Sequence, residues 1–509
     1  MEAYRLGYGW GRNGSTGQIE WGAKQVMGKT SRGAARGEGQ AGRVRRNEPL
    51  AGERGSVRRL RAFVCAGVFL FACCGFLPKK AEARQATTAQ GSPAQTAEPN
   101  QTERAGQAPG GKTDQFRLNK ETYEKAVAYS KAWYRLYFVS VGWSIACLLL
   151  LLRLGVVARL RDFAERRAGS WQLQAAIFVP ALLLLLGVLR LPLRIYGHGL
   201  SLGYQQSVQG WGSWFWDCTK AELLNVGLGL VVALILFAVI RSKPRTWWLY
   251  FWFAAVPLAT FLVFVTPLVI DPMFNKFEPL KDKNPALVAS IEELTEKAGM
   301  PIPAERMFLM QASAKTNQIN AYVTGIGASK RVVIWDNTIR KLTSGEVLSV
   351  VGHEIGHYAL GHVVKGFAFF LAALLVGLYV AYRALQWALG RWGAAWGIRG
   401  QQDWAALGAL LLIVEVLGFL AEPVRNGFSR MVELAADVYG LELTHGIVPD
   451  SSEEAARAFQ VMGEKDLADP NPSAFITFWL YSHPPIAKRV EFAHNYDPWG
   501  KGEEPQYVK

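Results

Sequence analysis

The 509-residue sequence contains few cysteines and few histidines. Five cysteines occur, and none follows Cys218. A disulfide framework or a zinc cluster held by thiolates is therefore excluded from the C-terminal half, where any metal must bind to His, Asp or Glu. The chain has only seven histidines. A pattern that needs two of them at a fixed spacing is rarely met by chance.

The net charge of +15 does not indicate a protein that binds nucleic acid. Residues 1–61 hold thirteen Lys or Arg and five Asp or Glu, so this leader carries more than half of the excess. Most of the remaining surplus lies beside apolar segments, where basic side chains contact lipid headgroups and set topology. We expect no nucleic-acid partner.

The N-terminal part resembles a targeting region. Residues 1–61 form a basic leader without periodicity, which we expect to be disordered. Within residues 62–83, a short apolar stretch follows several arginines and precedes Ala-Glu-Ala, which is typical of a signal peptide or a short anchor. Residues 84–115 are rich in Gln, Thr, Ala, Pro and Gly and predict a flexible linker.

Half of the residues are hydrophobic, and they gather in long runs. The apolar windows are residues 136–157, 173–190, 222–241, 247–270, 366–389 and 405–421. Several are long enough to cross the hydrocarbon of a bilayer, and tryptophans stand near their ends. We predict a mainly helical, multi-pass membrane protein with about six spanning helices, four in residues 116–270 and two in residues 366–424.

Residues 271–365 and 425–509 are more polar and predict a soluble α+β unit made of two parts. The first part holds an amphipathic helix, Lys283 to Gly299, and three short strands. These strands are Arg306 to Met310, Ile319 to Ile326 and Arg331 to Asp336. Thr343 and Glu346 form a capping box, after which the helical pattern is expected to run unbroken through His362 into the fifth span.

The segment from His353 to His357 matches the pattern His-Glu-x-x-His within that predicted helix. Residues four apart share a helix face, so both imidazoles can reach one tetrahedral zinc ion. Glu354 is rotated by about 100° from His353 and lies beside the metal, where it can take a proton from zinc-bound water. The pattern predicts a zinc metalloendopeptidase. The alternative is a helix with two hydrogen-bonded histidines.

A catalytic zinc site needs one more protein ligand and a position for water. A His six residues after the second ligand is excluded, because Leu360 and Val363 occupy the positions where that pattern places Gly and His. Glu433 is the best downstream candidate. Asp437, four residues later, could hold a ligand imidazole by its other nitrogen. The alternative for both residues is a solvated helix face.

Six short blocks occur in order between Lys120 and His494. They are residues 271–280, 320–322, 330–336, 353–357 with His362, 429–437 and 482–485. In these blocks the chain resembles the integral-membrane zinc metalloproteases typified by CAAX prenyl protease 1, with the signal-like leader suggesting a bacterial member. The resemblance implies spanning helices around a chamber that is capped by a zincin-like α+β metalloprotease domain.

The resemblance also implies roles for single residues. His353, His357 and Glu433 would bind one Zn²⁺ per chain. Glu354 would be the general base, and Asp437 the acid that supports the site.

His483 and Arg489 would contact substrate and stabilise an oxyanion, and Asn320, Ala321 and Tyr322 would form an edge strand that pairs with an extended substrate. Without the resemblance, His483 would be a cap for the following helix, Arg489 a surface charge, and the strand an ordinary solvent-facing one.

The sequence leaves orientation and substrate open. The resemblance implies a domain facing the cytoplasm, whereas the leader and the basic loops at 159–167 and 241–245 favour the opposite side. Residues 120–135 are basic too. We expect peptide or protein substrates, including C-terminal segments of membrane-associated proteins, and a bacterial inner membrane. Alternatives are a heat-shock-type quality-control zinc protease, and a transporter or scaffold with a structural zinc, which would need a fourth protein ligand.

Overall fold

The computed structural model describes residues 116–508 except residue 326. The predictions for residues 1–61, 62–83 and 84–115 lie outside this part. Within it, six helices are long and apolar enough to cross a membrane, which confirms the predicted number. They are α2 (Lys120–Arg153), α4 (Trp171–Gly203), α5 (Trp211–Ser242), α6 (Trp247–Val265) with its continuation to Phe274, α11 (His362–Trp392) and α12 (Ala406–Thr444).

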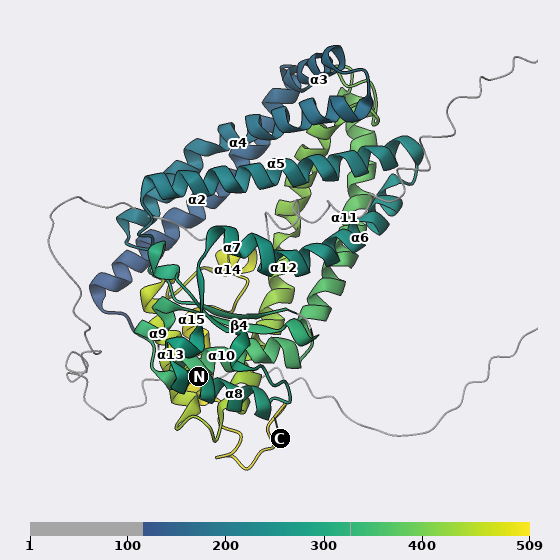
Figure 1. Cartoon of the computed structure of the whole chain (residues 1–509). Coiled ribbons are helices and arrows are strands. Elements are labelled where there is room, and N and C mark those ends of the chain that lie inside the picture. The colour runs from purple at the N-terminus through teal and green to yellow at the C-terminus, as the bar shows by residue number, and fades with distance from the viewer. Residues whose placement is uncertain (1–115, 326, 509) are drawn as a thin grey trace, which may run out of the picture. The chain divides into compact units, whose positions relative to one another are not determined.

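The spans pack around an apolar cluster at the end where α3 (Val156–Arg167) connects α2 to α4 (Figure 1). Trp404 and Phe237 are buried at its centre, with ring centroids 4.4 Å apart. The soluble elements lie at the opposite end of the helices (Figure 1). The fold is therefore a helical membrane region with a soluble domain attached to one side.

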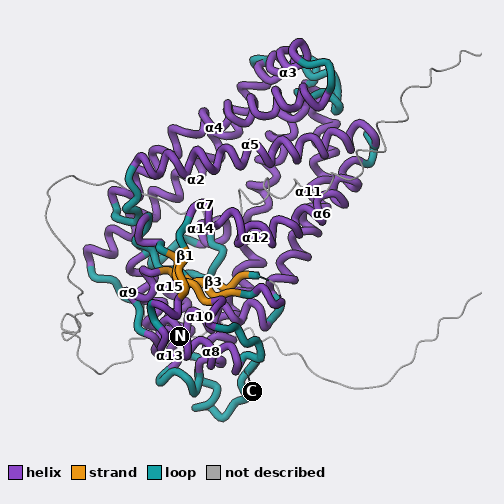
Figure 2. Tube along the Cα trace, viewed as in Figure 1, coloured by secondary structure: helices purple, strands orange, loops and turns teal. Residues whose placement is uncertain are grey.

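The soluble domain contains a four-stranded sheet in the order β1-β2-β4-β3 (Figure 2). The strands are β1 (Phe277–Pro279), β2 (Met307–Met310), β3 (Ala321–Thr324) and β4 (Arg331–Trp335). β2 and β4 are parallel, and the two outer pairs are antiparallel. The three predicted strands are present with shorter bounds, whereas β1 has only three residues and was not predicted.

Helices from both polar segments of the sequence complete the domain. They are α7 (Asp271–Phe274), α8 (Pro285–Lys297), α9 (Asp336–Lys341), α10 (Ser344–Ala359), α13 (Ser451–Lys465), α14 (Ala474–Leu480) and α15 (Ile486–Asn495). One hydrophobic cluster joins Ile291 of α8 and Val351 of α10 to Leu443 at the end of α12. The two segments therefore fold around a shared core.

The helix α10 begins as predicted but ends earlier. Thr343 and Glu346 form both hydrogen bonds of the capping box. The helix ends at Ala359, and Gly361 takes the left-handed conformation with φ 67° before α11 begins at His362. Glycine adopts this conformation without steric cost, which makes it a common helix terminator. The prediction of an unbroken helix into the fifth span is therefore wrong.

The helices α10 and α12 approach each other closely through glycines. A Cβ on Gly440 of α12 would lie 2.8 Å from the backbone nitrogen of His353. A Cβ on Gly352 of α10 would lie 3.2 Å from the carbonyl oxygen of Gly440. Backbone therefore packs on backbone here, and larger residues cannot be accommodated without separating the two helices.

We predict that Gly440→Ala destabilises the protein, although alanine is the better helix former by about 1 kcal/mol. The added methyl group pushes α10 away from α12, at a cost of about 1–3 kcal/mol. Thermal unfolding in detergent should show a lower midpoint. Gly418→Ala is the matched control, because it lies in the same helix and its Cβ would meet nothing within 4 Å. Equal stability of the two variants would contradict the prediction.

Candidate active site

Two histidines of α10 and one glutamate of α12 converge on a common point. The Nε2 atoms of His353 and His357 are 3.2 Å apart. Glu433 places Oε2 3.2 Å from Nε2 of His353 and Oε1 3.7 Å from Nε2 of His357. The ligand atoms of the three residues all lie within 4.8 Å of one another. The structure thus brings together the three ligands that the sequence suggested.

These distances fit a tetrahedral zinc site. Ligand bonds of about 2.0–2.2 Å place two ligand atoms roughly 3.3–3.6 Å apart. The donors are also of the type that zinc prefers in catalytic sites, two imidazoles and one carboxylate. The residues present therefore fit the metal.

His353 is held by a buried charged chain. Its Nδ1 lies 2.7 Å from Oδ1 of Asp437, so Nδ1 donates a proton and Nε2 is turned toward Glu433. Arg489 donates to both oxygens of Asp437, over 2.9 Å from Nε and 2.6 Å from Nη2. Only 8% of Arg489 is exposed, so the alternative that it is a surface charge is wrong.

His357 has a different partner, which the sequence did not suggest. Its Nδ1 lies 3.1 Å from Nδ1 of His362, the first residue of α11. One ring must donate and the other accept, because two nitrogens at this distance share a single proton. His362 is therefore placed to orient His357, as Asp437 orients His353. The only signal in the sequence was the position of His362 just before the fifth apolar window.

Glu354, the candidate general base, connects α10 to the edge of the sheet. The carboxylate of Glu354 accepts a hydrogen bond from the backbone N–H of Val323 in β3. Tyr358, one turn further along α10, donates to the carbonyl of Gly325 over 3.0 Å. Among the described strands, β3 pairs only with β4, and side chains of α10 bond to the backbone at its other side. No pattern in the sequence indicates the Val323 contact.

The predicted substrate-binding residues lie at the beginning of this edge strand. Ala321 and Tyr322 are its first two residues, and Asn320 precedes them. The backbone of Asn320 is anchored inward, because its N–H donates to Oγ1 of Thr338 over 3.0 Å and its carbonyl accepts from Trp335 over 3.1 Å. Ala321 is buried, with 2% of the whole residue exposed.

His483 reaches the cluster from the turn before α15. Its Nε2 lies 3.2 Å from Oε2 of Glu433, and its Nδ1 lies 2.9 Å from Oγ of Ser482. The side chain is 53% exposed, unlike the other members of the cluster. The N-cap of α15 is Pro485 and no side chain caps this helix, so the alternative that His483 is a helix cap is wrong.

Burial and charge shift the pKa values of the residues on α10. Burial lowers the pKa of His353, but the charge and hydrogen bond of Asp437 outweigh it and raise the pKa to about 10. Burial, together with the charge of His353, lowers the pKa of His357 to about 3. Burial raises the pKa of Glu354 to about 7, and the charge of His353 opposes this shift. The metal-free site therefore holds a proton on His353.

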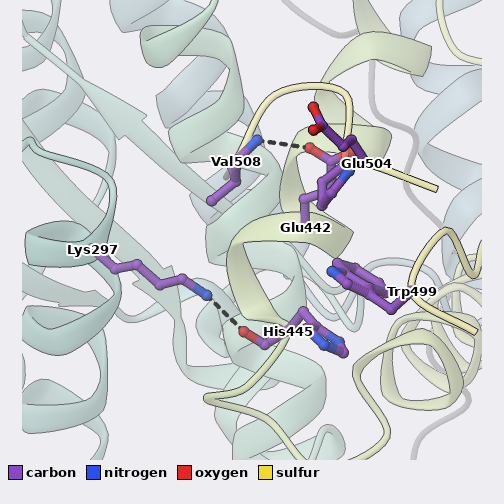
Figure 3. Close-up of a pocket in the computed structure, with 7 residues that line it drawn as sticks. Lys297, Glu442, His445, Trp499, Glu504 and Val508 are labelled. Carbon is purple, nitrogen blue, oxygen red and sulfur yellow. Dashed lines mark hydrogen bonds between the residues drawn. The ribbon is translucent and has the colours of Figure 1, made fainter. Parts of the chain in front are cut away.

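A separate hollow lies at the C-terminal end of α12, beyond Asp437, and does not belong to this cluster. It has a volume of about 420 Å³ and is lined by residues that include Lys297, Glu442, His445 and Trp499 (Figure 3). Glu442 accepts hydrogen bonds from the backbone N–H groups of Gln506, Tyr507 and Val508 over 2.5, 2.7 and 2.9 Å. This carboxylate fixes the C-terminal segment to α12, and its acceptors are taken up by protein groups.

Comparisons with known proteins agree with this arrangement. Residues 281–497 match the model of peptidase family M48, and residues 107–276 match the model of the CAAX prenyl protease N-terminal region with five membrane helices. A relative from Bacillus subtilis (strain 168), the uncharacterized metalloprotease YhfN, is 36% identical over 73% of this chain and 85% of its own length.

The chain belongs to peptidase family M48.

A CAAX prenyl protease 1 homolog from Dictyostelium discoideum is 30% identical over 45% of this M48 chain and 53% of its own length. The crystal structure of Ste24p from S. mikatae has the same fold, with a TM-score of 0.64 over 74% of this chain and 89% of that one at 23% identity. The protein is thus an integral-membrane metalloprotease that acts on peptides or proteins.

We predict that zinc binding releases about one proton near neutral pH, because His353 must lose its Nε2 proton to become a ligand. Below its pKa of about 10 the metal-free His353 is protonated, so the affinity for zinc should fall as pH falls. Titration calorimetry in buffers of different ionisation enthalpy measures this proton. The Glu354→Gln variant lacks the other group with a pKa near neutrality, so the proton that this variant still releases comes from His353. A heat of binding independent of the buffer would contradict the prediction.

Proposed function

We propose that this M48 protein is a zinc endopeptidase in which His353, His357 and Glu433 hold one zinc ion. The observation that supports this most directly is the convergence of their ligand atoms within 4.8 Å. Among the described residues, these three form the one group of this kind. A structural zinc would need four protein ligands, whereas three leave a position for water. This favours catalysis over a transporter or scaffold with a structural metal.

The bound zinc would act as a Lewis acid that lowers the pKa of water and polarises the scissile carbonyl. Glu354 takes the proton from the attacking water and returns it to the leaving amine. A pKa of about 7 suits this role, because the base must both accept and release a proton near neutral pH. The Val323 N–H bond fixes the carboxylate on the side of the site that faces the edge strand.

The remaining residues orient the metal ligands or stabilise the negative charge that develops on the scissile carbonyl oxygen. Asp437 keeps the Nε2 atom of His353 turned toward the metal position. Both bonded nitrogens of Arg489 are directed at Asp437, so we assign it a positioning role instead of the substrate contact that the family resemblance implies. His483 is exposed and beside Glu433, and it could donate to the oxyanion of the tetrahedral intermediate.

We propose that the substrate adds to β3 as an extended strand along Ala321 and Tyr322. The backbone of Asn320 is already bonded to Thr338 and Trp335, so Asn320 contributes its side chain instead of backbone pairing. Relatives are described as CAAX prenyl protease 1, which supports C-terminal segments of membrane-associated proteins as one substrate class. The match to the CAAX prenyl protease N-terminal region favours this branch over a heat-shock-type protease. The similarity to a Bacillus protein supports a bacterial membrane as the location.

We predict that Glu354→Gln lowers the turnover of an unfolded protein substrate by about 10²–10⁴-fold, the usual contribution of a general base. The zinc content, measured by mass spectrometry of the purified protein, should stay stoichiometric, because Glu354 is not a ligand. Glu293→Gln in α8, an exposed residue, is the control and should leave both readings unchanged. A Glu354→Gln protein that binds zinc and retains full activity would disprove the assigned role.

We predict that Asp437→Asn weakens zinc binding by about 10–100-fold, because the amide no longer fixes the orientation and basicity of His353. Competition with a fluorescent chelator measures the affinity, and circular dichroism tests whether the protein remains folded. Glu422→Gln removes a carboxylate from the same helix that pairs with Arg425 and should leave the affinity unchanged. Equal affinities of the folded variants would show that Asp437 does not support the metal site.

A further inference from the structure

Three connections between spans lie together at the end of the bundle away from the protease domain. They are residues 153–170 around α3, residues 241–246 between α5 and α6, and residues 391–405 between α11 and α12. Arg399 pairs with Glu165 at 2.6 Å, and Gln401 donates to the carbonyl of Pro244 over 2.8 Å. We call this surface the arginine-rich end (top of Figure 1).

The arginine-rich end carries a large positive excess. Its three connections contain ten Lys or Arg and three Asp or Glu. All three acidic residues are engaged by arginines: Asp162 and Asp403 by the buried Arg161, and Glu165 by Arg399. Seven basic side chains are exposed and have no carboxylate partner among the described residues. These are Arg153, Arg159, Arg166, Arg167, Lys243, Arg245 and Arg391.

Exposed tryptophans lie at the same end. Trp392 is exposed beside Arg391, and its ring centroid lies 4.8 Å from that of the exposed Trp387. Tryptophan and arginine together are typical of the membrane interface, where the ring contacts acyl chains and the cation contacts phosphates. This surface therefore fits a layer of anionic phospholipid.

The opposite end of the spans is less basic and is covered by protein. The short connection from Tyr204 to Gly210 contains no Lys or Arg. It docks on the protease domain, where Gln206 donates to the carbonyl of Lys465 over 3.0 Å. Residues 116–135 hold five Lys or Arg and two Asp or Glu, but Ser130 of this segment bonds to the carbonyl of Leu467 in the same domain. The basic side chains of this segment are exposed, and Lys125 pairs with Glu121 at 2.6 Å, so this end carries a smaller positive excess than the arginine-rich end.

Short connections rich in Lys and Arg stay in the cytoplasm, whereas large domains are translocated largely without regard to charge. We propose that the arginine-rich end binds the anionic phospholipids of the cytoplasmic leaflet and that the protease domain lies on the opposite side of the membrane. This orientation is opposite to the one that the family resemblance implies. If the protein is the protease proposed above, this orientation means that its substrates are proteins that have left the cytoplasm. That consequence rests on the proposed function.

Two single-cysteine variants of the full-length chain, with the five native cysteines replaced by serine, test the orientation. Gly169→Cys lies at the arginine-rich end, where a Cβ would meet nothing within 4 Å, and Glu293→Cys is exposed on α8 of the protease domain. In bacterial spheroplasts, a membrane-impermeant maleimide should label Glu293→Cys at once and Gly169→Cys only after lysis. The reverse pattern, or equal labelling of both variants before lysis, would overturn the proposal.

Labelling needs no proteolysis, so it separates this proposal from the proposed function. If the labelling is as expected but the parent protein is inactive, the proposed function is overturned and the orientation stands. If the parent is active but the labelling is reversed, the orientation is overturned and the proposed function stands.

The lipid contact has its own test. Purified protein in nanodiscs of phosphatidylglycerol should unfold at a higher temperature than in phosphatidylcholine at low salt. The difference should be lost in a variant with four arginines replaced and kept in a control with four exposed lysines of the protease domain replaced. The variant is Arg153→Gln, Arg166→Gln, Arg245→Gln and Arg391→Gln, and the control is Lys281→Gln, Lys283→Gln, Lys488→Gln and Lys501→Gln. An equal loss in both proteins, or no lipid dependence of the parent, would overturn the contact.

Discussion

The close approach of α10 to α12 is the constraint on which the rest of the site depends. His353 and His357 lie on one helix, and Glu433 and Asp437 lie on the other, so the metal donors meet only if the two backbones nearly touch. Glycines at the contact make this possible, since a Cβ on Gly440 would lie 2.8 Å from the nitrogen of His353. The site is therefore built on backbone packing between the two helices, and hydrogen bonds with Asp437 and His362 hold its imidazoles.

Charge makes the same contact more specific. A buried carboxylate and a buried guanidinium are costly alone, but Asp437 and Arg489 satisfy each other through two hydrogen bonds and leave one oxygen to share with His353. Because Arg489 is on α15, this pair also ties the last helix of the chain to the zinc-motif helix. A displacement of either helix would leave a buried charge without its partner, which is why such networks hold a single arrangement.

The sequence predicted the features that repeat or that match a spacing. Long apolar runs give the six spans, and the His-Glu-x-x-His pattern places two imidazoles on one helix face. Contacts between distant segments could not be predicted in this way. Nothing near Val323 indicates that its N–H meets Glu354, and nothing near Arg489 indicates its burial. The helix break at Gly361 was missed because an apolar helical pattern continues on both sides of a single glycine.

That break joins the candidate metal site to a membrane span. His362 is the first residue of α11, and its Nδ1 lies 3.1 Å from Nδ1 of His357. Because the two rings are in contact, a shift or rotation of α11 would also move the imidazole of His357. The geometry of the site therefore depends on how the span α11 is packed.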